Sequence, residues 1–240
     1  MFDLIDRAED IARYFGITPA AAQVRLARGF GSLHADVAAS WRLANPTTEA
    51  QIIEWYRTTD TYIWELSAYH MDRTFGYMAQ ADSIAGTIAA HGARRVLCLG
   101  DGIGDLTALC VQRGLLACYH DLADSRTADF ALKRAGWRHV AMSGWLTSDF
   151  TPAIGSHWDS IVSLDFLEHV PNVEEWVRAI HGALNDGGTF CAQNAFNVGS
   201  GPQGAIPCHL AVNDRFESDW DPLLASVGFS QITSNWYRKL

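Results

Sequence analysis

The feature that most constrains the fold of this chain is an apolar run that leads into a cluster of glycines. Residues 96–99 read Val-Leu-Cys-Leu, and Gly100, Gly102 and Gly104 follow within five positions. An apolar pattern at helical spacing then resumes over residues 105–109. This order predicts a buried strand, a tight turn and the start of a helix. Glycines let the backbone approach a ligand closely, and the free N–H groups of a helix start attract an anion.

The next predicted strand indicates what kind of ligand this turn would bind. It covers residues 115–120 and is followed at once by Asp121. Asp121 lies 19 residues after Gly102 (121 − 102 = 19), which is the spacing at which dinucleotide-binding units place their ribose-binding acid. Tight turns in other α/β domains also carry glycines, so the acid is what favours a nucleotide-like ligand.

These residues resemble the signature of the class I S-adenosylmethionine-dependent methyltransferases. That signature is an apolar strand, G-x-G-x-G and an acid at the end of the second strand, here Gly100, Gly102, Gly104 and Asp121. Dehydrogenases usually have G-x-G-x-x-G instead. The chain departs from the family at Cys98, where an acid is usual. The resemblance covers about residues 92–229 and implies S-adenosylmethionine as the cofactor and methyl transfer as the activity.

The chain after Gly92 alternates predicted strands and helices. Further strands are expected at residues 138–142, 158–165, 189–194 and 229–236, and helices at 173–184 and 215–227. This alternation predicts an α/β fold with a doubly wound, mostly parallel, Rossmann-like methyltransferase sheet. The family usually ends in an antiparallel hairpin. We expect that hairpin to be shortened or built differently, because its second strand would need residues beyond Leu240.

The sequence divides into a helical N-terminal segment, residues 1–91, and a cofactor-binding catalytic domain, residues 92–240. Thr18 before Pro19 predicts a helix start, and Thr48 with Gln51 predicts a capping box. Residues 1–45 fit either a plain helical hairpin or a DNA-binding helix-turn-helix. They hold five acidic residues and five arginines, so no basic footprint supports DNA binding and the plain hairpin is favoured.

The stretch over residues 52–75 is dense in aromatic side chains. In the family, helices before the glycine motif lie over the cofactor and shape the substrate pocket. We expect two or three of these rings to line the site and the others to pack in the core. The rings are Trp55, Tyr56, Tyr62, Trp64, Tyr69 and His70.

The resemblance implies a cofactor site at the carboxyl edge of the parallel sheet, where ligands of such sheets bind. The loop after the third strand is expected to contact the adenine, with the Trp145 ring stacking on it. The implied cofactor-binding residues are Gly100, Asp101, Gly102, Gly104, Asp121, Leu122, Ser143, Gly144, Trp145 and Asp165.

A group of acids and histidines follows the fourth predicted strand. Asp165, Glu168 and His169 are similar to the acid-x-x-Glu-His element of two metal-using O-methyltransferase groups, one in ubiquinone biosynthesis and one acting on small-RNA 3′ termini. The resemblance implies Asp165, Glu168, His169 and His209 as ligands of Mg²⁺, Mn²⁺ or Zn²⁺. His209 lies on a Gly- and Pro-rich loop, residues 195–212, that we expect to be a substrate lid.

Two other interpretations of this group stay open. His169 or His209 can act as a metal-free general base with Glu168 as a catalytic partner, because a hydroxyl acceptor must lose its proton. Alternatively, the Leu-Glu-His-Val-Pro segment only shapes the floor of the pocket.

Composition limits the partners and the compartment. The formal net charge of −9 argues against a long nucleic acid substrate, and no apolar run reaches the ~20 residues that span a membrane. Five cysteines without paired spacing and an acidic N-terminus favour a cytoplasmic protein. We expect a small-molecule acceptor, methylated at oxygen or nitrogen, and a homodimer formed through the N-terminal helices. The alternatives are a helix-turn-helix regulator that senses the cofactor and a catalytically inactive partner subunit, which the departure at Cys98 favours.

Overall fold

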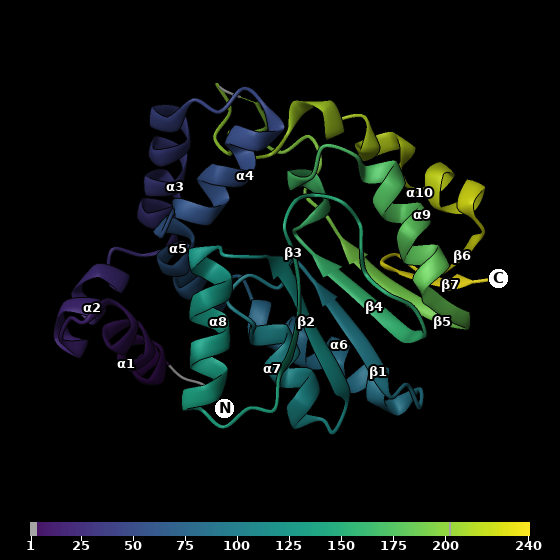
Figure 1. Cartoon of the computed structure of the whole chain (residues 1–240), viewed down its shortest axis with the longest axis horizontal. Helices are drawn as coiled ribbons and strands as arrows, with labels where there is room; N and C mark the ends of the chain where they lie inside the picture. The colour runs from purple at the N-terminus through teal and green to yellow at the C-terminus, as the bar shows by residue number, and fades with distance from the viewer. Residues whose placement is uncertain (1–3, 202) are drawn as a thin grey trace.

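A central sheet with helices on both faces forms the structure, a computed structural model that describes residues 4–201 and 203–240 (Figure 1). The α-helices span Leu4–Phe15 (α1), Pro19–Leu26 (α2), Phe30–Ala44 (α3), Glu49–Thr58 (α4), Thr61–Met71 (α5), Tyr77–Ala90 (α6), Asp105–Gln112 (α7), Arg126–Trp137 (α8), Val173–Ala183 (α9) and Phe216–Val227 (α10). The strands span Arg95–Leu99 (β1), Leu116–Leu122 (β2), Ser143–Thr147 (β3), Trp158–Leu164 (β4), Leu184–Gln193 (β5), Phe229–Thr233 (β6) and Trp236–Lys239 (β7). Short 3₁₀ turns cover Leu167–His169 and Ala211–Asn213.

The sheet has the order β3-β2-β1-β4-β5-β7-β6. The first five strands are parallel, and Leu97 on β1 lies between Cys118 on β2 and Ile161 on β4. β7 runs antiparallel to both of its neighbours, β5 and β6. This confirms the predicted doubly wound, mostly parallel fold.

The C-terminal hairpin corrects one expectation. Residues 229–236 were expected to be one strand, but β6 ends at Thr233 and β7 begins at Trp236, so both strands of the hairpin lie before Leu240. The turn between them takes only two residues, which lets the complete hairpin fit.

The two faces of the sheet bury alternate residues of the strands. Leu97, Ile161 and Phe190 pack toward α9 and α10, whereas Val96 and Val162 pack toward α6 and α7. All five cysteines are buried and unpaired. Among the described helices, none combines the length and the apolar character needed to cross a bilayer.

The third strand lies later in the sequence than expected. Residues 138–142 connect α8 to the sheet, and β3 covers Ser143–Thr147 instead. Four of its five residues are exposed because β3 is an edge strand. Its sequence therefore lacks the apolar run that marks a buried strand.

The predicted helix starts of the N-terminal segment are confirmed. The Thr18 hydroxyl accepts a hydrogen bond from the Ala21 N–H at 3.2 Å, with Pro19 as the first helical residue. Thr48 and Gln51 form the capping box that begins α4.

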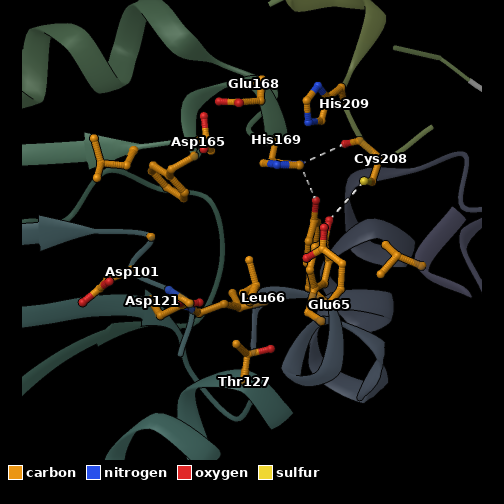
Figure 2. Close-up of a pocket in the computed structure, with 18 of the residues that line it drawn as sticks. Glu65, Leu66, Asp101, Asp121, Thr127, Asp165, Glu168, His169, Cys208 and His209 are labelled. Carbon is orange, nitrogen blue, oxygen red and sulfur yellow. Dashed lines mark hydrogen bonds between the residues drawn. The ribbon is translucent and has the colours of Figure 1, made fainter. Parts of the chain in front are cut away.

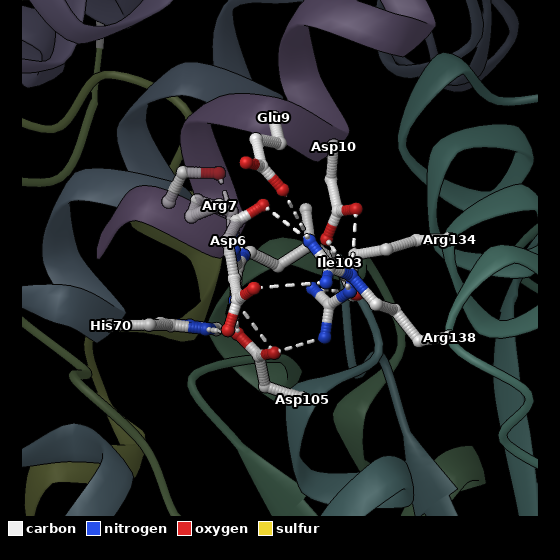
Figure 3. Close-up of polar contacts among 10 residues, drawn as sticks. Asp6, Arg7, Glu9, Asp10, His70, Ile103, Asp105, Arg134 and Arg138 are labelled. Carbon is white, nitrogen blue, oxygen red and sulfur yellow. Dashed lines mark hydrogen bonds and ion pairs between the residues drawn. The ribbon is translucent and has the colours of Figure 1, made fainter. Parts of the chain in front are cut away.

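A buried ionic cluster holds α1 against α7 and α8 (Figure 3). The Arg7 guanidinium donates to both carboxylate oxygens of Asp105 at 2.7 Å, and Arg134 and His70 also bind Asp105. Burial alone would raise the pKa of Asp105, but the charges of Arg134 and Arg7 outweigh it and hold that pKa well below its usual range. The α1 helix directs Arg7 into the protein rather than toward solvent. This placement of Arg7 favours the plain helical hairpin over a DNA-binding helix-turn-helix.

Candidate active site

A cavity of about 430 Å³ lies at the carboxyl edge of the parallel strands. The glycine turn, the end of β2 and the segment after β4 form one side, and residues of α3–α6 form the other. Residues 206–209 of the loop after β5 complete the wall. This volume falls in the range of small-molecule sites, roughly 300–1,000 Å³.

The glycine turn forms the part of the cavity nearest β1. Gly100 and Gly102 have φ values of +59° and +52°, a backbone region that favours glycine. A Cβ atom on Gly100 would lie 2.2 Å from the Phe166 ring. Gly100 therefore has no room for any side chain, and both glycines line the cavity.

Asp101 supplies the hydrogen bonds that order this turn. Its carboxylate accepts from the N–H groups of Leu106 and Thr107, at 3.1 and 2.7 Å, and from the Thr107 hydroxyl at 2.5 Å. Burial raises the pKa of Asp101 to about 7. Cys98, which stands where the family usually has an acid, is instead packed in the apolar core under α7. Asp101 thus stabilises the start of α7 from within the turn.

Asp121 reaches from the end of β2 to the glycine turn. Its carboxylate accepts the Gly102 N–H at 3.0 Å and the Leu122 N–H at 2.7 Å. Burial raises the pKa of Asp121 to about 6. Asp121 and Leu122 both line the cavity, so this acid is held at the place where the spacing predicted a ribose-binding group.

Two expected cofactor-binding elements lie outside the cavity lining. Ser143, Gly144 and Trp145 belong to β3 rather than to a loop, and the Trp145 ring lies against Gly155. The cavity meets this part of the chain later, at Thr147, Asp149 and Phe150, because the parallel pairing of β3 with β2 places Thr147 at the carboxyl edge.

Gly104 is the second of these elements. It precedes α7 with a positive φ of +79° and packs toward Met142 and Ala131 rather than lining the cavity. Its position fits a role in the turn and in helix packing.

The segment after β4 carries the candidate catalytic residues, which Figure 2 shows on the sheet side of the cavity. The His169 Nδ1 atom lies 3.2 Å from the Cys208 carbonyl oxygen and 2.9 Å from the Tyr56 hydroxyl. We assign the proton to Nδ1 because the carbonyl oxygen can only accept, and in this tautomer Nε2 has a free lone pair. Burial, followed by the charge of His209, lowers the pKa of His169 to about 3. His169 is therefore neutral at pH 7.

Two acids beside His169 are also perturbed by their burial. Burial and the charge of Asp165 raise the pKa of Glu168 to about 8, and one Glu168 oxygen accepts the Ala195 N–H at 2.9 Å. Asp165 follows β4 with a φ of +49°. Burial, then the charge of Glu65, raises the pKa of Asp165 to about 6.

Three of the four expected metal ligands come together. Glu168, His169 and His209 each offer a ligand atom, and these atoms lie within 4.8 Å of one another. Glu168 Oε2 and His209 Nδ1 are buried and have no hydrogen-bond partner among the described residues. One carboxylate and two imidazoles suit a divalent transition metal. Asp165 does not belong to this group of ligand atoms.

The aromatic stretch divides between the cavity and the core. Tyr56, Tyr62, Tyr69 and His70 line the cavity, whereas Trp55 and Trp64 are buried in apolar clusters. Phe30, His34 and Glu65 also line the cavity, from α3 and α5, although they belong to no sequence motif. Nothing in their spacing marks them, because their placement depends on how the helices pack onto the sheet.

Comparison with known proteins identifies the fold as that of the class I S-adenosylmethionine-dependent methyltransferases. An O-methyltransferase family protein from Burkholderia thailandensis matches with a TM-score of 0.56 and 15% identity, over 96% of this chain and 86% of that one. The mitomycin 7-O-methyltransferase MmcR matches with a TM-score of 0.54 and 17% identity, over 99% and 72%. No protein-family model and no curated protein sequence matches this chain.

Proposed function

We propose that this protein transfers the methyl group of S-adenosylmethionine to a hydroxyl or an amine of a small molecule. The observation that carries the proposal is the cavity at the carboxyl edge, which brings together the glycine turn, Asp121 and the Asp165–His169 segment. The related fold supports it, and the name of the mitomycin 7-O-methyltransferase indicates that this fold can serve an oxygen acceptor. The acidic lining of the cavity favours a small acceptor over a nucleic acid.

The chain's own groups would position the cofactor. When bound, S-adenosylmethionine supplies an already activated methyl group, so the protein's task is orientation and exclusion of water. We assign this binding to the backbone of Gly100 and Gly102 and to the carboxyl groups of Asp121 and Asp165. Asp121 is preorganised for it because two backbone N–H groups fix its carboxylate.

His169 is the candidate general base for a hydroxyl acceptor. Its Nδ1–H is held by the Cys208 carbonyl, which leaves Nε2 to accept the proton of the acceptor. Its neutral state at pH 7 makes that lone pair available, although a pKa of about 3 makes it a weak base. The metal-dependent route is an alternative to this base. A divalent metal held by Glu168, His169 and His209 would occupy the Nε2 lone pair and would instead lower the pKa of a bound hydroxyl.

The inactive-subunit alternative loses its main support. That alternative depends on Cys98 standing where an acid is usual. Asp101 nevertheless supplies hydrogen bonds that order the turn, so the turn does not depend on an acid at position 98. The regulator alternative would require α1 and α2 to contact DNA, whereas Arg7 is buried against Asp105.

Calorimetric titration with S-adenosylmethionine and S-adenosylhomocysteine tests the proposal directly. We expect micromolar binding that Asp121→Asn weakens about tenfold or more, because a charged acceptor makes stronger hydrogen bonds than a neutral one. Asp124→Asn is the matched control, since Asp124 is exposed on the same connection and does not line the cavity. Absence of binding by either ligand would overturn the proposal. Elemental analysis of the same sample decides whether a metal is present.

A further inference from the structure

Glu65 is a buried acid that lines the cavity and has one carboxylate oxygen without a partner among the described residues. It lies on α5 with 6% of its surface exposed. His34 Nδ1 lies 3.2 Å from Glu65 Oε1, whereas Oε2 has no hydrogen-bond partner among the described residues. A buried carboxylate oxygen without a partner is costly, so it points to a ligand that supplies a hydrogen-bond donor.

The position of Glu65 separates it from the cofactor's side of the cavity. Its partner His34 lies on α3, whereas the next residue, Leu66, lies against the glycine turn. A Cβ atom on Gly102 would lie 2.7 Å from Leu66 Cδ1. Figure 2 shows Glu65 and Leu66 on the helical side of the cavity, apart from Asp165 on the sheet side.

The surroundings of Glu65 favour a positively charged group. The described residues that line the cavity include no lysine or arginine, whereas Asp165 adds a further carboxyl group. Phe30 and Tyr69 also line it, with ring centroids 5.1 Å apart. Aromatic faces attract cations, and a carboxylate binds an ammonium group through a charge-assisted hydrogen bond. An anionic acceptor would instead be repelled.

We propose that Glu65 is a specificity-determining residue that binds an ammonium group of the acceptor, so that the acceptor is an amine-bearing small molecule. The ammonium group donates to Glu65 Oε2 and rests against the rings of Phe30 and Tyr69. This inference rests on the proposed function, because it assigns the acceptor to the cavity that would also hold the cofactor.

The experiment compares three phenols that share a para two-carbon chain and differ in the group, and so the charge, at its end. Tyramine carries an ammonium group, 4-ethylphenol is neutral and 3-(4-hydroxyphenyl)propionate carries a carboxylate. Each is titrated calorimetrically into protein saturated with S-adenosylhomocysteine, using the wild type, Glu65→Gln and Glu54→Gln. Glu54 is the matched control because it is exposed on α4 and does not line the cavity.

We expect the wild type and Glu54→Gln to bind tyramine at least tenfold more tightly than 4-ethylphenol and to bind the carboxylate most weakly. Glu65→Gln should remove the preference for tyramine and leave the Kd of S-adenosylhomocysteine within twofold of wild type. Its melting temperature should not fall, since the change removes a charge with an unpartnered oxygen. This combination separates a role in acceptor binding from a fault in folding.

Several results would overturn the inference. These are similar binding of all three phenols, no binding of any of them, or a tyramine preference that survives in Glu65→Gln. A loss of S-adenosylhomocysteine affinity in Glu65→Gln would instead assign this acid to the cofactor's own amino group. If S-adenosylhomocysteine fails to bind the wild type, the proposed function fails. The charge preference is then measured in the ligand-free protein by thermal shift.

Discussion

Replacing Arg7 with methionine should destabilise the protein strongly, although Arg7 lies in a helix outside the sheet. Arg7 and Asp105 are 1% and 0% exposed, and Arg134 and Asp10 are the other buried charges of this cluster. Arg7 and Arg134 both bind Asp105, whereas the shorter pair of Asp10 is with Arg138, at 2.9 Å. Arg7→Met fills a similar volume with an apolar side chain but removes one of the two arginines that bind the fully buried Asp105.

The expected cost follows from the partners that remain. Removing one partner of a buried ion pair costs about 3–5 kcal/mol. Arg134 and His70 still contact Asp105 in the variant, so we expect the lower end, about 3 kcal/mol. With a urea m-value of roughly 3 kcal/mol/M, the unfolding midpoint should fall by about 1 M.

Urea unfolding followed by tryptophan fluorescence and circular dichroism measures this shift. Arg28→Met is the control, because Arg28 makes a similar two-bond pair with Asp36 on the exposed surface. Solvent screens that pair, so its loss should move the midpoint far less. Equal shifts in the two variants would refute the reasoning that burial makes the Arg7 pair important.

Two further predictions concern the cavity. Gly100→Val should lower the affinity for S-adenosylhomocysteine at least a hundredfold in calorimetry, since even a Cβ atom would lie 2.2 Å from the Phe166 ring. Gly136→Ala on α8, where a Cβ meets nothing within 4 Å, should leave that affinity unchanged. Burial lowers the pKa of His120 from 6.5 to about 4, so only the unfolded state binds this proton between those pH values. The free energy of unfolding of the wild type should therefore fall as the pH falls from 6.5 to 4. In His120→Leu, the fall over the same range should be about 3 kcal/mol smaller. Urea unfolding across this pH range measures both. An unchanged pH dependence in His120→Leu would show that other groups cause it.

The sequence was most informative where a buried strand runs into a turn. The apolar run before Gly100, the spacing to Asp121 and the segment after β4 each mark the end of a parallel strand. Parallel strand ends meet at one edge, so their convergence was predictable without knowing how the helices pack.

What could not be predicted depends on contacts between distant segments. The edge strand β3 has an exposed sequence that resembles a loop, which is why Ser143–Trp145 were expected at the cofactor. Glu65 and His34 come from different helices, and their pairing follows from how α3 packs beside α5. Arg7 and Asp105 are 98 residues apart, and neither has a local signal for burial as an ion pair.

The ionic cluster also has a consequence for folding during synthesis. Arg134 follows Arg7 by 127 residues (134 − 7 = 127), and both bind Asp105 in the finished cluster. At about 5–20 residues per second, the ribosome adds this stretch in roughly 6–25 s. Until α8 has emerged, α1 has no complete docking surface. His209 emerges later still, so the cavity wall is completed only after most of the sheet has been synthesised.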